Sequence, residues 1–179
     1  MKMVVLLGSL RKESINRSVA ETIRERYRKE LDIEIADLGG LPLYNQDDEN
    51  HPPESVTSFK QQVAEADGVI IVTPEYNWSI PGVLKNAIDW CSRVDKVLIN
   101  KPVMAVGASP TAFGTIRAQA HLRDILASPG VQARVLPAAT NEVLVNFAAD
   151  KVKDGRLVDE TTLTFLDKVL SQFVKQIKQ

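Results

Sequence analysis

The chain has 179 residues, of which 44% are hydrophobic, and this composition suits one compact domain with a substantial core. A formal net charge of −1 provides no basic field for nucleic acid, and no apolar segment reaches membrane-spanning length. A single cysteine excludes an internal disulfide, and two distant histidines argue against a structural zinc site. We therefore expect one cytoplasmic domain, residues 1–179, with no nucleic-acid, membrane or metal ligand.

Strand and helix patterns alternate along the chain. Five short apolar or alternating segments predict strands, at residues 3–7, 32–37, 68–73, 102–107 and 131–136. Five segments with apolar residues at helical spacing predict helices, at residues 15–27, 53–66, 81–93, 115–127 and 160–178. Residues 41–53 are polar and predict a long surface loop. The alternation predicts an α/β fold, with a parallel sheet and helices on both of its faces.

In such sheets a ligand binds outside the carboxyl ends of the strands. The loop after the first predicted strand carries Ser9, Arg11, Ser14 and Asn16, and a helix follows directly. Side-chain donors beside a helix N-terminus are typical of a phosphate site, and Arg11 offers a fork to phosphate oxygens. The loop lacks the glycines of a dinucleotide fingerprint and the lysine of a P-loop. As an alternative, Ser14 fits the N-cap of the helix.

The loop after the third predicted strand, residues 74–82, is both aromatic and polar. A planar heteroaromatic ring needs a flat wall and hydrogen bonds at its edge, and this turn supplies both. Tyr76 and Trp78 could instead cover the core or form a subunit interface. Glu75 is either a hydrogen-bonding residue of the site or a solvated carboxylate.

These motifs, with Ile80-Pro81-Gly82 and residues 84–90, resemble the NADPH-dependent FMN reductase family over nearly the whole chain. The resemblance implies a flavodoxin-like three-layer sandwich with a five-stranded parallel sheet in the order 2-1-3-4-5. It also implies that FMN is the cofactor. The residues implied to hold its phosphate and ribityl end are Ser9, Arg11, Ser14, Ile15 and Asn16. The residues implied to hold its ring are Pro74, Glu75, Tyr76 and Asn77.

The loop after the fourth predicted strand, residues 107–119, departs from the family pattern. That pattern has a second glycine where this chain has Thr115. A β-branched residue resists positive φ and adds bulk, so we expect reduced access to the backbone at this point. Phe113 and Thr115 would then shape the space beside the flavin, with Ser109 as the flavin contact from this loop.

The resemblance implies an enzyme that passes a hydride from NADPH or NADH to flavin N5. Two electrons then reach a quinone, azo, nitroaromatic or metal-oxyanion acceptor, or free FMN. No catalytic acid, base or nucleophile is evident, and we assign Cys91 to the core or an interface. His121 reads as a partly buried or interface group.

Two other functions stay open. On the same fold, a flavodoxin-type electron carrier would bind FMN without oxidising NAD(P)H itself, and a flavin-free regulator would bind another nucleotide. Because relatives assemble, we expect a homodimer or homotetramer that uses Trp78, Ile80 and the helix at residues 81–93.

Overall fold

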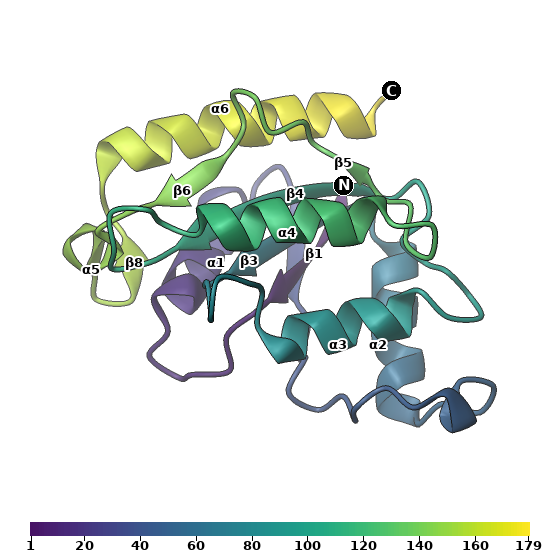
Figure 1. Ribbon diagram of the computed structural model, residues 1–179. Helices are drawn as coiled ribbons and strands as arrows, with labels where there is room; N and C mark the ends of the chain where they lie inside the picture. The colour runs from purple at the N-terminus through teal and green to yellow at the C-terminus, as the bar shows by residue number, and fades with distance from the viewer.

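The computed structural model describes residues 1–179 and contains a parallel sheet whose central path runs β2-β1-β3-β4-β5 (Figure 1). These strands are β1 (Lys2–Leu7), β2 (Asp32–Ile35), β3 (Gly68–Thr73), β4 (Pro102–Ala108) and β5 (Arg134–Val135). The predicted strand order and fold class are confirmed. Leu7 pairs with Val72 and Thr73 with Gly107, so β1, β3 and β4 end at one edge of the sheet.

Helices cover both faces of the sheet, as the alternation predicts. One face packs against α2 (Glu54–Glu65), α3 (Gly82–Cys91) and α4 (Ile116–Ala127), and the other against α1 (Ile15–Arg26) and α6 (Glu160–Ile177). Along β1, Val4 and Leu6 enter the first core, whereas Val5 and Leu7 enter the second. This alternation lets one apolar strand supply two cores.

The C-terminal third differs from the prediction. Only Arg134–Val135 of the expected strand at 131–136 forms β5, and β6 (Val143–Val145) pairs with the later part of β4. The loop at residues 136–142 divides this edge of the sheet into two short strands. Three further unpredicted elements follow, namely α5 (Ala148–Lys151), β7 (Val152–Lys153) and β8 (Arg156–Leu157). A 3₁₀ turn, η1 (Gln46–Asp48), interrupts the predicted loop at 41–53.

Asp167 joins α1 to α6 on the outer side of the second core. It accepts hydrogen bonds from Arg26 Nε at 2.8 Å and Nη2 at 2.7 Å, and from the Tyr27 hydroxyl. The Arg26 guanidinium holds the pKa of the Asp167 carboxyl below its usual value. None of the helices is both long enough and apolar enough to cross a membrane.

Candidate functional site

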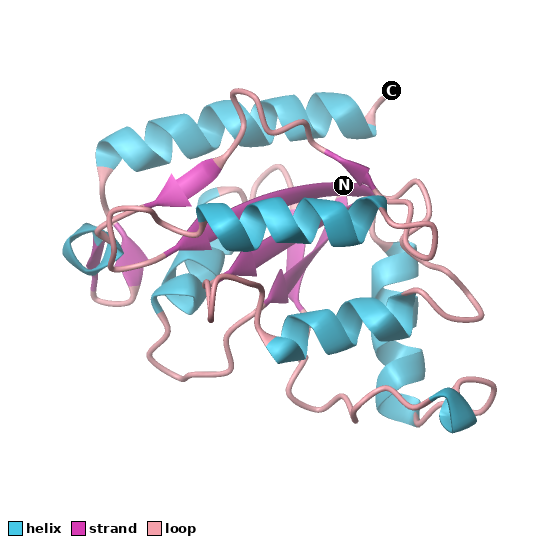
Figure 2. Ribbon diagram, in the orientation of Figure 1, coloured by secondary structure: helices cyan, strands magenta, loops and turns pink.

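The loops that follow β1, β3 and β4 gather at the carboxyl edge of the sheet (Figure 2). The first loop leaves β1 in close contact with β3, because Gly8 donates its N–H to the Val72 carbonyl at 2.8 Å. A Cβ at Gly8 would lie 2.9 Å from Thr73 Oγ1, so a larger residue would push the two strands apart. The close contact between β1 and β3 therefore fixes the position of Gly8, where the predicted phosphate loop begins.

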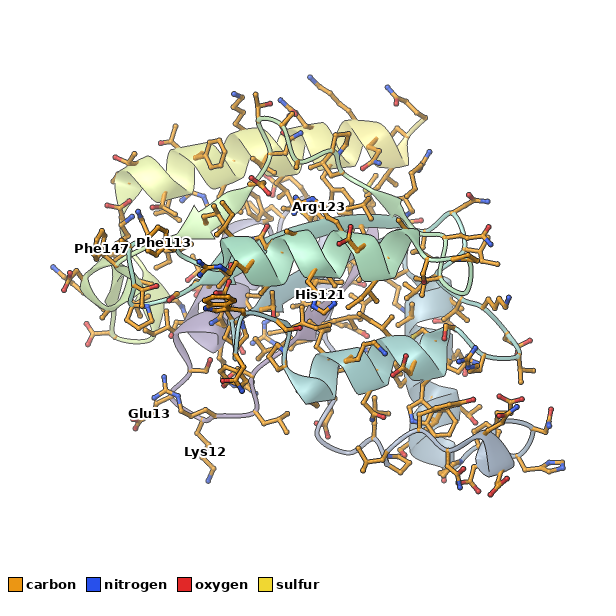
Figure 3. The ribbon with its side chains drawn as sticks, viewed as in Figure 1. Lys12, Glu13, Phe113, His121, Arg123 and Phe147 are labelled. Carbon is orange, nitrogen blue, oxygen red and sulfur yellow. The ribbon has the colours of Figure 1, made fainter.

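Most polar groups of the first loop have no partner in the protein. Ser9 is only 3% exposed, yet its hydroxyl makes no hydrogen bond, and the exposed Arg11 has no carboxylate within 4 Å. The backbone N–H groups of Ile15 and Asn16 lie in the first turn of α1, where a helix provides no acceptor. Ser14 is the N-cap, as the alternative reading predicted, and accepts from Arg17 N at 3.4 Å. Figure 3 shows Lys12 and Glu13 projecting from this loop into solvent.

Asn16 differs from the other residues of this loop because its carboxamide is committed to the protein. Its Nδ2 donates to the Ala108 carbonyl at 2.9 Å, and its Oδ1 accepts from the Ala108 N–H at 3.0 Å. Both groups are buried. Asn16 thus fixes the start of α1 against the end of β4, and its backbone N–H is the group left for a ligand.

The second loop is a tight hairpin. Tyr76 and Ser79 exchange two backbone hydrogen bonds of 2.9 Å each. The residues between them, Asn77 and Trp78, have φ values of 50° and 64°, as a type I′ turn requires. Positive φ is unfavourable for a bulky residue, and such residues concentrate at functional sites. Trp78 is 70% exposed and Tyr76 is also exposed, so neither covers the core.

Three side-chain contacts fasten this hairpin to the first turns of α4. Glu75 Oε2 accepts from the backbone N–H groups of Arg117 and Ala118, both at 3.0 Å. The Arg117 guanidinium stacks 4.2 Å from the centroid of the Trp78 ring. Ser79 Oγ and His121 Nδ1 are 2.7 Å apart. Glu75 is therefore more than a solvated carboxylate, because its Oε2 caps a helix whose own N-cap residue makes no side-chain bond.

The third loop corrects the expectation about Thr115. Its φ is −124°, and the positive φ of 60° belongs to Gly114. The Thr115 side chain is buried against Gly107, where an added Cβ would lie 1.8 Å from its Oγ1. Thr115 adds its bulk to the core and takes none of the space beside the loop. Phe113 does face that space, because it is 69% exposed.

Ser109 lies at the predicted position but is already engaged. Its N–H donates to the Val145 carbonyl at 3.0 Å, and its hydroxyl lies 3.0 Å from the Thr111 hydroxyl. The strand β6, which the sequence reading missed, thus supports the third loop. Two residues after Val145, Phe147 donates its N–H to the Thr111 carbonyl at 3.2 Å and is 51% exposed at the same edge.

Neither of the remaining chemically active side chains provides a catalytic group. Cys91 is fully buried, as expected, and burial raises the pKa of its thiol to about 12, so the nucleophilic thiolate is not populated at neutral pH. Of the two expectations for His121, partial burial is wrong, because the residue is exposed beside Ser79 (Figure 3), and a place in an interface stays a prediction. No three His, Cys, Asp or Glu side chains are grouped to hold a metal ion.

The donor set fits the phosphate end of a flavin mononucleotide. A serine hydroxyl without a protein partner, a free guanidinium and two free N–H groups at a helix start are the groups that bind a phosphate dianion. The hairpin offers peptide groups and a tyrosine ring beside this loop, which suits a flat heteroaromatic ring.

Known proteins match the chain over most of its length. Residues 1–150 match the family described as NADPH-dependent FMN reductase. A 2-hydroxy-1,4-benzoquinone reductase from a Burkholderia species is 38% identical over 181 residues, covering 99% of this chain and 97% of the relative. The NADH:(hydroxy)cinnamate reductase subunit CrdA of Vibrio ruber is 38% identical, covering 97% of this chain and 86% of the relative. The structure of FerB, a flavoenzyme NAD(P)H:(acceptor) oxidoreductase from Paracoccus denitrificans, superposes with a TM-score of 0.88 at 34% identity, covering 99% and 97%.

Proposed function

Because the chain belongs to the NADPH-dependent FMN reductase family, we propose that it is an FMN-dependent oxidoreductase that uses NAD(P)H to reduce small planar acceptors. The observation that carries this proposal is the set of unpaired donors at the first loop, next to a hairpin fixed against α4. The family is one of oxidoreductases, so the chain is an enzyme.

The first loop would hold the FMN phosphate. Ser9 and Arg11 would donate from their side chains, and Ile15 and Asn16 from their backbone N–H groups. Ser14 would contribute by capping α1, which orients those N–H groups. These residues retain the cofactor and take no part in the chemistry.

The hairpin and the third loop would hold the ring. Residues 74–77 offer backbone groups to its edge, because the Glu75 carboxylate is used by α4. Ser109 would face the ring from the third loop. When bound there, FMN would supply the redox chemistry, namely two-electron transfer by way of a hydride from the nicotinamide, with N5 as the proposed hydride acceptor.

The proposed class of acceptor follows from the carboxyl edge of the sheet, which is open and bordered by aromatic side chains. Trp78, Phe113 and Phe147 are exposed around it and suit a flat ring. We therefore propose quinones as the main acceptors, each gaining two electrons and two protons while one NAD(P)H is oxidised. Azo and nitroaromatic compounds, metal oxyanions and free FMN complete the candidate set, and a hydroxyquinone and a hydroxycinnamate belong in the panel because relatives are named for them.

The decisive experiment adds NADPH or NADH anaerobically to the purified protein loaded with FMN. Loss of the flavin absorbance at a catalytically useful rate, and its return on adding a quinone, supports the enzyme. An oxidised flavin that only a separate reductase can bleach would establish the electron carrier instead. A protein that binds no FMN in a thermal-shift titration would overturn both readings and favour a flavin-free regulator. Comparing the two nicotinamides gives the donor preference.

We also propose a homodimer or homotetramer in the cytoplasm. The exposed Trp78 supports an interface that borders the hairpin and leaves the acceptor edge open, whereas Ile80 is buried in the protein's own core and drops out as a candidate. Sedimentation that finds a fully active monomer at micromolar concentration would exclude this assembly.

A further inference from the structure

Arg117 is a cation without a counter-ion at the hairpin. Its guanidinium lies 4.2 Å from the centroid of the Trp78 ring and 5.9 Å from that of Phe113. No carboxylate approaches within 4 Å of it, although six other basic side chains form such pairs. The guanidinium lies over the Trp78 ring, and its N–H groups make no hydrogen bond within the protein, so they stay free to donate.

The surroundings hold this cation in place. The Arg117 backbone N–H is bound by Glu75, so the start of the side chain is fixed. Its outer end rests on Trp78, which the hairpin presents in a left-handed conformation that a bulky residue avoids without compensation. An arginine that is only solvated on a helix face would need neither the bound backbone N–H nor the aromatic support. We infer that the guanidinium is held in place as a positively charged group for a ligand.

Flat apolar surface lies beside the cation. Phe113 is 69% exposed, and Phe147 is 51% exposed with a φ of 47°, a second strained aromatic residue at this edge. The Thr111 carbonyl accepts from both Gly114 N and Phe147 N, at 3.4 and 3.2 Å, which ties the backbones of the two segments together. In Figure 3 both phenylalanines extend from the end of the molecule at which the loops gather.

We propose that Arg117 is a specificity-determining residue that favours planar acceptors bearing an ionised oxygen, such as hydroxyquinones and aromatic carboxylates. The ring of the acceptor packs on the exposed aromatic side chains, and its anionic oxygen accepts hydrogen bonds from the guanidinium. This inference rests on the proposed reductase function and adds a charge preference to it.

The test compares two quinones of similar shape, 2-hydroxy-1,4-naphthoquinone, which is ionised at neutral pH, and the neutral 2-methyl-1,4-naphthoquinone. The measured quantity is the ratio of their kcat/KM values with FMN-loaded enzyme and saturating nicotinamide. We expect Arg117→Gln to lower this ratio by about tenfold or more, because a charge-assisted hydrogen bond is lost. Arg117→Lys, which keeps the charge without the fork, should lower it less.

Arg93→Gln is the matched control. Arg93 also stacks on an aromatic ring, 5.4 Å from the Tyr44 centroid, but it follows the C-terminal end of α3, away from the hairpin. The ratio should stay within about twofold of the wild type in this variant. Equal losses for both quinones in Arg117→Gln would overturn the proposal and leave Arg117 as a support for Trp78. An unchanged ratio would overturn it as well.

A binding measurement separates this inference from the reductase proposal. Fluorescence of the exposed Trp78 is titrated with 4-hydroxybenzoate and with the neutral 4-hydroxybenzamide, with Trp90 as the second, buried fluorophore. Stronger binding of the anion, lost in Arg117→Gln, supports the charge preference even if no quinone is turned over. Equal binding of acid and amide overturns it, whether or not the enzyme oxidises NAD(P)H.

Discussion

The first loop and the hairpin are both expected to touch the cofactor, yet they treat their polar groups in opposite ways. At residues 8–16, the Ser9 hydroxyl, the Arg11 guanidinium and two helix N–H groups have no partner in the protein. At residues 74–81, Glu75 and Ser79 are bound to α4, and the Arg117 guanidinium lies over the ring of Trp78. One segment keeps its donors for a ligand, while the other uses its side chains to fix the shape of its backbone.

This difference teaches that chemical type alone does not make a binding residue. Asn16 lies in the donor-rich loop but belongs with the fixed group, because both ends of its amide are bound to Ala108. Substitutions in the fixed group should therefore lower the free energy of unfolding, whereas loss of the free donors should weaken ligand binding and leave folding nearly unchanged.

Gly107→Ala should have the largest effect. The new Cβ would lie 1.8 Å from Thr115 Oγ1 and 2.8 Å from the Thr73 carbonyl, which the packed edge cannot absorb. We expect a loss of about 3 kcal/mol in the free energy of unfolding, measured by urea denaturation. Adding Thr115→Gly should recover part of it. A variant as stable as the wild type would show that the backbone at this edge can shift to make room for the methyl group.

Asn16→Ala should cost about 2 kcal/mol, because it leaves the buried N–H and C=O of Ala108 without partners. The same denaturation assay measures it. Asn50→Ala, at an exposed asparagine without a side-chain hydrogen bond, is the matched control and should change stability little. If Asn16→Ala instead lost only FMN affinity, Asn16 would belong with the free donors.

Glu75→Gln should cost about 1 kcal/mol, since a neutral amide interacts more weakly than a carboxylate with the first N–H groups of α4. Glu13→Gln removes the same charge from an exposed position in the first loop and should be neutral. Thermal denaturation of both variants compares the two segments directly. Equal melting temperatures would mean that the Glu75 hydrogen bonds to α4 add no stability.

Asp167→Asn should have the smallest effect and lies on the other core, away from both segments. Because Arg26 lowers the pKa of Asp167 in the folded protein, its contribution is present above the unfolded value of about 4 and is lost as pH falls below it. The pair is partly exposed, so less than about 1 kcal/mol is expected. The variant should flatten the acid limb of a stability–pH curve. An unchanged loss of stability at acid pH would show that the Arg26–Asp167 pair does not cause it.

Most of the central fold could be predicted from the sequence, because the hydrophobic patterns of its strands and helices are unambiguous. Short continuous apolar runs with a glycine or proline at their ends, at 68–73 and 102–107, are typical of buried strands between two helical layers. The sequence predicts a longer fifth strand than the structure has: Val131 packs as core before the strand begins, Leu136 adds one last hydrogen bond to the Val103 carbonyl at 2.7 Å, and β6 is only three residues long. The β7–β8 hairpin did leave a signal, since Asp154-Gly155 takes positive φ at both residues of its turn.

The site divides in the same way. The first loop could be read from its residue types, because serine, arginine and a helix start identify an anion site locally. The role of Glu75 could not, since its partners lie more than forty positions further along the chain. The inward orientation of Thr115 was equally hidden, because it depends on the space left by Gly107. Tertiary contacts that no local residue pattern encodes decided both outcomes.

The most direct test of the division between free and committed donors compares FMN with riboflavin, which lacks the phosphate. Fluorescence titration of the apoprotein should give an FMN Kd at least about a hundredfold lower than that of riboflavin. Replacing both Ser9 and Arg11 with alanine should remove most of this difference while leaving riboflavin binding and apoprotein stability unchanged. Equal affinity of the wild type for the two flavins would show that the first loop is not the phosphate site.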